Sequence, residues 1–192
     1  QREDGSPRRA YLVLTADKGM AGSFNQNVLK LLLEKVEKLF GEEDQIAALA
    51  RKYHRKDQVF YVGRGLDSGV SYEGSLKLKE ISYINSFAIA AGELKHGTIA
   101  LMEEETLVFA LATQDFLYEK MVSNVEEIKA RGARVVAIAK EGRTEIEQVA
   151  DEVIYIPPCM DEVSPVLAVI PLQIFAYYVA KERGCNIDKP KN

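Results

Sequence analysis

The sequence predicts a three-layer α/β/α fold, in which helices cover both faces of a mostly parallel β-sheet. Short apolar runs rich in β-branched residues alternate along the chain with segments of helical periodicity, and the connections between them are short. That order is typical of parallel sheets, whose consecutive strands need a crossover helix. The size also fits, because 192 residues with 47% hydrophobic content suffice for one substantial core.

The first elements are a strand and two helices. Residues 1–9 are polar and are interpreted as a tail. Residues 11–15 (YLVLT) form an apolar β-rich run, which predicts a strand. Residues 25–39 carry apolar side chains at helical spacing, and Gly41 separates that helix from a second one at 42–53.

Strands and helices alternate through the rest of the chain. The continuous apolar run at 106–112 predicts a strand buried on both faces. Further strands are predicted at residues 59–62, 87–90, 134–139 and 153–156. Helices are predicted at residues 71–84, 92–101, 116–131, 145–150 and 164–183. The expected sheet is therefore flavodoxin-like.

Glycine, proline and serine mark the ends of two helices. Gly132 fits the stop of the helix at 116–131. In the last helix Ser164 is a candidate N-cap, Pro165 occupies the first position, and Gly184 ends it.

The composition excludes several classes of protein. The net charge of -4 weighs against a nucleic-acid surface. Two cysteines and two histidines, His54 and His96, cannot support a disulfide framework or a four-cysteine zinc site, so we expect no metal and no cofactor. The longest apolar run, residues 166–180, is interrupted by Pro171 and Gln173, so we expect no membrane helix and a cytoplasmic protein.

A glycine-rich turn follows the predicted strand at 59–62. Its glycines are Gly63, Gly65 and Gly69, and Ser68 stands where the dinucleotide fingerprint has its third glycine. The turn is either a phosphate-binding loop or a tight connection between strand and helix.

The helix at 71–84 has a charged face. Glu73, Lys77 and Glu80 follow one another at i, i+4 and i+7, so they share one side of the helix. They are either a solvated ladder of ion pairs or a carboxylate base with an ammonium beside it. His96 lies between a lysine and a glycine, and it is either a surface side chain or a group that titrates in a site.

Five stretches of the chain resemble the glucosamine-6-phosphate synthase family, also called glutamine–fructose-6-phosphate aminotransferase (isomerizing). The three longest are residues 72–84 (YEGSLKLKEISYI), residues 90–97 (AAGELKHG) and residues 184–192 (GCNIDKPKN), and the others are residues 63–65 (GRG) and 153–157 (VIYIP). The resemblance covers residues 36–192, and the part matched is the second of two sugar-isomerase (SIS) halves. It implies a SIS domain and a sugar phosphate, fructose-6-phosphate or glucosamine-6-phosphate, as ligand.

The resemblance also implies roles for individual residues. Glu80 would move a proton between C1 and C2 of the sugar, and His96 would assist ring opening in the site of a neighbouring subunit. Glu73 and Lys77 would line the site beside Glu80. The family's glutaminase domain, its first SIS half with the phosphate-holding loops, and its C-terminal imine-forming lysine have no counterpart in these 192 residues.

Residues 10–30 read AYLVLTADKGMAGSFNQNVLK and do not fit that family. The segment at residues 10–31 instead resembles the gamma subunit of the rotary ATP synthase. The division expected is a tail at 1–9, a gamma-like strand–helix segment at 10–35 and a SIS domain at 36–192, joined as a chimera. We expect a homo-oligomer that binds sugar phosphate weakly or not at all and has no turnover. The alternatives are a sugar-phosphate-binding SIS module of regulatory type and an active aminotransferase or isomerase.

Overall fold

The computed structural model describes residues 22–191. The chain divides into two units, with the boundary between Glu37 and Lys38. The helix α1 (Gly22–Gly41) begins in the first unit and ends in the second, which confirms the helix predicted at 25–39. The strand predicted at 11–15 lies outside the described residues.

The second unit is built on a five-stranded, wholly parallel sheet. Its strands are β1 (Gln58–Gly63), β2 (Asn85–Ala90), β3 (Leu107–Ala112), β4 (Arg134–Lys140) and β5 (Glu152–Ile156). Their spatial order is β2-β1-β3-β4-β5, and every neighbouring pair is parallel. This is the flavodoxin-like order, so the predicted fold class is confirmed.

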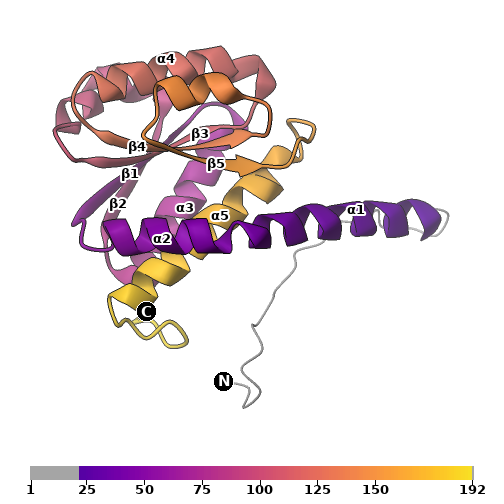
Figure 1. Ribbon diagram of the computed structural model, residues 1–192. Helices are drawn as coiled ribbons and strands as arrows, with labels where there is room; N and C mark the ends of the chain where they lie inside the picture. The colour runs from indigo at the N-terminus through magenta and orange to yellow at the C-terminus, as the bar shows by residue number, and fades with distance from the viewer. Residues whose placement is uncertain (1–21, 192) are drawn as a thin grey trace. The chain divides into compact units, whose positions relative to one another are not determined.

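Helices cover both faces of this sheet (Figure 1). One face carries α2 (Glu43–Tyr53), α3 (Leu66–Ser82) and α5 (Ser164–Glu182), and the other carries α4 (Tyr118–Lys129). Both β3 and β4 lie inside the sheet, which explains why β3 and residues 135–139 of β4 are continuously apolar.

Aromatic side chains fill the core on the α5 face. Tyr61 of β1 and Phe109 of β3 stack with ring centroids 5.1 Å apart, and Phe175 of α5 lies 4.6 Å from Phe109. The opposite face of the same strands packs on apolar side chains of α4. Alternation along each strand thus divides the core into two layers.

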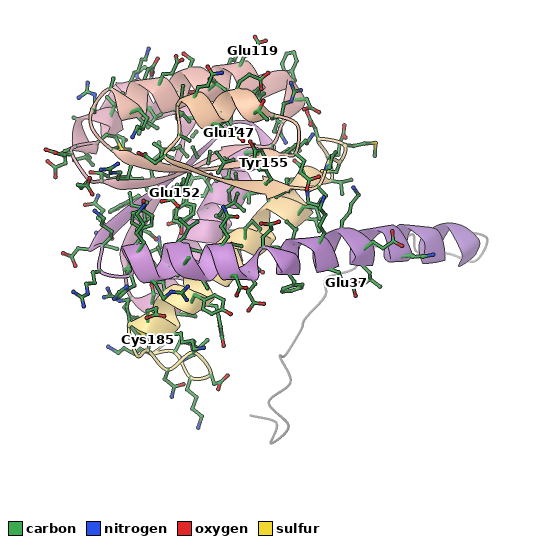
Figure 2. All side chains as sticks on the ribbon, in the orientation of Figure 1. Glu37, Glu119, Glu147, Glu152, Tyr155 and Cys185 are labelled. Atoms are coloured by element: carbon green, nitrogen blue, oxygen red, sulfur yellow. The ribbon has the colours of Figure 1, made fainter. Side chains whose placement is uncertain are left out.

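Short 3₁₀ helices lie between the strands along the chain. One of them, η4 (Thr144–Gln148), precedes β5, and Figure 2 shows Glu147 of η4 beside Tyr155 of β5. The Tyr155 hydroxyl donates a hydrogen bond to Glu147 at 2.5 Å. This contact fixes η4 against the last strand.

Three predicted helices differ from the observed ones, and the one predicted at 145–150 is the 3₁₀ helix η4. The helix predicted at 71–84 begins at Leu66. Its first residues are rich in Asp, Ser and Gly, which suggests a turn, but the burial of Asp67 and Val70 favours a helix there. The helix predicted at 92–101 is two 3₁₀ pieces, η1 (Ala91–His96) and η2 (Thr98–Leu101). They are separated by Gly97, whose φ of 132° is incompatible with a continuous helix.

The last helix, α5, follows its predicted bounds and ends before Gly184, whose φ is +68°. The capping prediction was wrong: Ser164 is the first helical residue, and its hydroxyl donates to the carbonyl of Asp161 instead of capping the helix. By length and composition α5 could cross a membrane despite Pro171, but half of it is buried, in contact with α2 and α3. Those contacts are the ones expected of a core helix.

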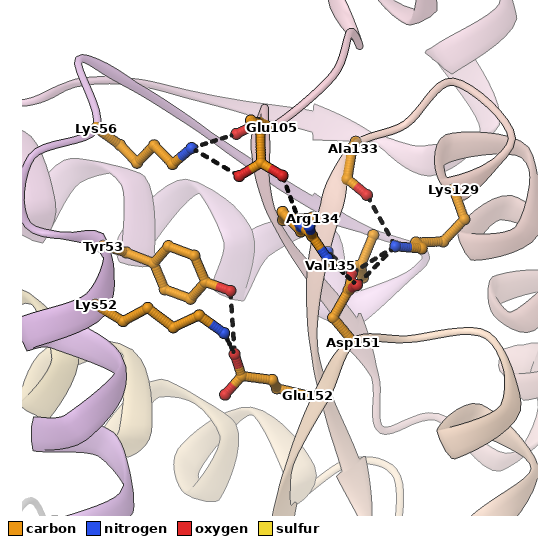
Figure 3. Close-up of polar contacts among 10 residues, drawn as sticks. All are labelled: Lys52, Tyr53, Lys56, Glu105, Lys129, Ala133, Arg134, Val135, Asp151 and Glu152. Atoms are coloured by element: carbon orange, nitrogen blue, oxygen red, sulfur yellow. Dashed lines mark hydrogen bonds and ion pairs between the residues drawn. The ribbon is translucent and has the colours of Figure 1, made fainter.

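Ion pairs tie the helices to the amino-terminal edge of the sheet (Figure 3). Asp151 accepts a hydrogen bond from Lys129 at 2.7 Å and another from Arg134 at 3.1 Å. Glu152, the next residue, accepts one from the Tyr53 hydroxyl of α2 at 3.0 Å. Elements from both faces are therefore anchored at the start of β4 and β5.

Candidate functional site

The structure brings Glu73, Lys77 and Glu80 together on α3. The Lys77 ammonium lies 2.8 Å from a carboxylate oxygen of Glu80 and 3.6 Å from one of Glu73. The three side chains are 32–39% exposed, so they are held in place yet open to a ligand. The cluster predicted from the spacing therefore exists, with the ammonium between the two carboxylates.

The charges of this cluster suit proton-transfer chemistry. The hydrogen bond with Glu80 raises the pKa of the Lys77 ammonium, and the charge of Glu73 adds to the effect. Lys77 therefore stays protonated at neutral pH. A carboxylate can take a proton from carbon next to a carbonyl, and a cation beside it stabilises the negative oxygen that results.

The structure does not bring His96 to this cluster. His96 ends η1, its side chain is 74% exposed, and the ionisable neighbour of its Nε2 is Glu93, at 4.0 Å. Among the described residues it makes no hydrogen bond or ion pair with the α3 cluster. In a single chain the imidazole is therefore available to a different site.

The glycine-rich turn connects β1 tightly to α3. A Cβ at Gly63 would lie 2.5 Å from the backbone oxygen of Asp67, and Gly65 has a φ of +56°. The amide N–H of Leu66 donates to the Gln114 side chain, and the next two N–H groups donate to carbonyls of the turn itself. Since these donors are already used, the geometry favours a tight connection over a phosphate cradle.

A buried polar network occupies the carboxyl end of β3. The carboxylate of Asp67 accepts hydrogen bonds from the backbone N–H of Thr113, at 2.8 Å, and from its hydroxyl. The Thr113 hydroxyl also lies 3.0 Å from that of Ser164 at the start of α5. Burial raises the pKa of Asp67, which the two hydrogen bonds partly offset.

A nearly buried lysine continues this network at the end of β4. Lys140, whose side chain is 5% exposed, pairs with Asp115 at 3.0 Å and Asp161 at 2.5 Å. Hydrogen bonds from Arg143 and Lys140 lower the pKa of Asp115. Burial acts to raise the pKa of Asp161, but the hydrogen bond from Lys140 outweighs it and the pKa falls.

The sequence patterns do not predict the polar residues at the carboxyl ends of the strands. Arg64, Thr113 and Lys140 stand at or just after the carboxyl ends of β1, β3 and β4. In open parallel sheets ligands bind outside those ends, so a polar residue directly after a predicted strand was the available signal. No spacing rule connects them along the chain.

Comparison with known proteins relates this arrangement to sugar-phosphate enzymes. The SIS domain family matches residues 52–183. The chain is 58% identical over 164 residues to the glutamine–fructose-6-phosphate aminotransferase [isomerizing] of Caldanaerobacter subterraneus, covering 85% of this chain and 27% of that protein. It is 52% identical over 161 residues to the enzyme of the same name from Clostridium acetobutylicum, covering 84% and 26%.

A solved structure matches the fold as well. The C-terminal domain of glucosamine-fructose-6-phosphate aminotransferase from Francisella tularensis superposes with a TM-score of 0.79 at 30% identity, over 88% of this chain and 48% of that one. This confirms the predicted likeness to the C-terminal SIS half of that enzyme. The chain spans about a quarter of the length of the curated relatives it matches. On its sequence and its fold alike, the chain belongs to the SIS domain family.

Proposed function

We propose that this domain supplies the proton-transfer face of a sugar-phosphate isomerase site, as in a glutamine–fructose-6-phosphate aminotransferase. The observation that carries the proposal is the Lys77 ammonium held between the carboxylates of Glu73 and Glu80 on an open face of α3. The names of the relatives point to fructose-6-phosphate as the substrate. Such a protein would act in the cytoplasm.

In this proposal Glu80 is the base. Its carboxylate removes a proton from the carbon next to the carbonyl or imine of the open-chain sugar, and the same group returns that proton to the neighbouring carbon. Lys77 keeps Glu80 oriented and places a positive charge where negative charge develops on oxygen. Glu73 holds the other side of the ammonium at 3.6 Å.

His96 would complete the site of a second copy of the chain. Among the described residues, the exposed imidazole of His96 makes no contact with the α3 cluster of its own subunit. Ring opening needs a group that can exchange a proton beside the sugar, and an imidazole can do so near neutral pH. Tyr72 and Leu76 add exposed apolar area on α3 that a second copy would cover. We expect a homo-oligomer, and a mass by light scattering that stays at one chain after a tenfold rise in concentration contradicts it.

The test of Glu80 uses a hybrid enzyme. Residues 38–192 replace the region they match in the Caldanaerobacter relative, and glucosamine-6-phosphate formation from fructose-6-phosphate is measured. Because a general base contributes about 10²–10⁴ to the rate, Glu80→Gln should lower kcat at least about 100-fold. The matched control is Glu119→Gln on the exposed side of α4 (Figure 2), which should leave kcat unchanged. A Glu80→Gln hybrid with full kcat would refute the role.

The 192-residue chain by itself should form no product. Isomerisation needs a phosphate anchor and an electrophile beside the base. Because such groups act as a unit, the reaction loses nearly all of its rate when some of them are missing. Product formation by the purified chain above that of its Glu80→Gln variant contradicts this expectation.

We further propose that residues 10–35 are a separate gamma-subunit-like strand–helix segment joined to the SIS domain as a chimera. The SIS family model matches residues 52–183 and does not reach this segment, whereas the match with the Caldanaerobacter relative covers 85% of the chain and therefore includes the last residues of the segment. Slow hydrogen exchange at residues 11–15 is expected if they form a paired strand, and rapid exchange there contradicts it. Amplification across codon 36 from genomic DNA of the source organism tests how the junction arose, because a product shows that a natural gene carries both segments and its absence indicates that they were joined artificially.

A further inference from the structure

A polar pocket lies across the sheet from the α3 cluster. It has a volume of about 220 Å³ and opens between η1, the turn after β1, and α4. Figure 1 places α4 and α3 on opposite faces of the sheet, so this pocket is separate from the α3 cluster of the same chain. Its polar lining comprises Arg64, Lys95, Lys120, Ser123, Asn124 and Glu127.

The guanidinium of Arg64 is oriented for a ligand. Its Nε donates a hydrogen bond at 2.9 Å to the side-chain oxygen of Asn124, which is buried in α4. It also lies against Gly92, where a Cβ would be 3.5 Å from Nη1. Within residues 22–191 the two terminal nitrogens make no hydrogen bond or ion pair, so they remain available as donors.

The other charges of the pocket are only partly compensated. Lys95 pairs with one oxygen of Glu127 at 2.8 Å, whereas Lys120 contacts only the ring of Phe116, at 6.0 Å, in the described part of the chain. The second carboxylate oxygen of Glu127 is buried and lacks a hydrogen-bond partner among the described residues. The pocket thus combines an excess of positive charge with one acceptor that needs a donor.

We propose that this pocket binds the phosphoryl group of a small phosphomonoester. The fork of Arg64 and the Lys120 ammonium would bind the phosphoryl oxygens, and a hydroxyl or amine next to the phosphate would donate to Glu127. A volume of about 220 Å³ is below the usual range of about 300–1,000 Å³ for sites of drug-sized ligands. It therefore suits a phosphate head group with a few attached atoms, such as a sugar phosphate acting as an effector away from the isomerase face.

The test is an amide NMR titration of the 192-residue chain with glucosamine-6-phosphate, inorganic phosphate and sulfate. Saturable shifts are expected at Gly92 and Ser123, which line the pocket. Lys120→Gln should weaken phosphomonoester binding about tenfold, the loss of one charge-assisted contact. The matched control is Lys181→Gln, because Lys181 also lies over an aromatic ring, that of Tyr178, at 5.6 Å. The Lys181→Gln variant should bind the phosphomonoester as tightly as the wild type does.

Further arms separate this pocket from the isomerase face. Glu80→Gln should leave the shifts at Gly92 and Ser123 unchanged, so that a failure of either proposal shows by itself. Sulfate, which carries no proton at neutral pH, should bind more weakly because it cannot donate to Glu127. Three results would each overturn the proposal. They are equal binding of sulfate and phosphomonoester, equal weakening of binding by Lys120→Gln and Lys181→Gln, and the absence of shifts at Gly92 and Ser123.

Discussion

Replacing Gly63 by alanine tests the packing that positions the charged face of α3. An added Cβ would lie 2.5 Å from the Asp67 carbonyl oxygen, 2.6 Å from its carbon and 2.9 Å from the Ser68 nitrogen. All three are backbone atoms of the first turn of α3, so no side chain can rotate away. The start of the helix has to move by about half an ångström or more, and overpacking of this kind costs about 1–3 kcal/mol.

The control is a second glycine of the same helix. A Cβ added at Gly69 would meet no neighbouring atom within 4 Å, so Gly69→Ala places its methyl group in open space and should gain about 0.5–1 kcal/mol from helix propensity. For a protein of this size 1 kcal/mol corresponds to about 2–4 °C in Tm. Gly63→Ala should therefore melt about 2–12 °C below the wild type, and Gly69→Ala slightly above it.

Thermal and urea unfolding of both variants measures the difference. The reasoning is refuted if Gly63→Ala unfolds at the wild-type temperature, or if both alanine variants lose the same stability. The first result would mean that β1 and α3 separate without cost. The second would mean that flexibility of the whole turn, and not the contact with Asp67, requires glycine.

Three further measurements address the core and the charge network. Tyr61→Phe should raise the free energy of unfolding by about 1 kcal/mol, seen as a higher urea midpoint, because the buried Tyr61 hydroxyl has no hydrogen-bond partner among the described residues; a loss of stability would reveal a partner. The pKa values of Asp115, Asp151 and Asp161 are lowered in the folded state. These carboxylates therefore stabilise the folded protein above the unfolded pKa of about 3.9, and that stabilisation disappears as the pH falls through the folded pKa values. Urea midpoints that stay constant from pH 5 to pH 2 would contradict this. Lys140→Met should cost about 1–2 kcal/mol and flatten that acid dependence, and an unchanged pH profile of the urea midpoint would show that Lys140 does not hold the two aspartates it contacts.

The charged face of α3 could be predicted because it is a local property. Residues at i, i+4 and i+7 share one side of any helix, so the contacts of Lys77 with Glu73 and Glu80 follow once the segment is helical. The strands were predictable for a related reason. A strand such as β3, inside a parallel sheet, is buried on both faces, and only a continuous apolar run satisfies that environment.

The remaining features depend on contacts between residues far apart in the chain. Arg64 and Asn124 are 60 positions apart, and Lys140 meets Asp161 only because the carboxyl ends of neighbouring parallel strands share one edge. The early start of α3 has the same origin. The residues of its first turn are ones that favour a β-turn, and the buried hydrogen bond between Asp67 and Thr113 stabilises the helix instead. The sequence by itself determined the order of elements and the charged face, since both follow from the period of side chains along the chain. The tertiary structure decided which loops meet, because strand order and close packing bring together residues that no local pattern connects.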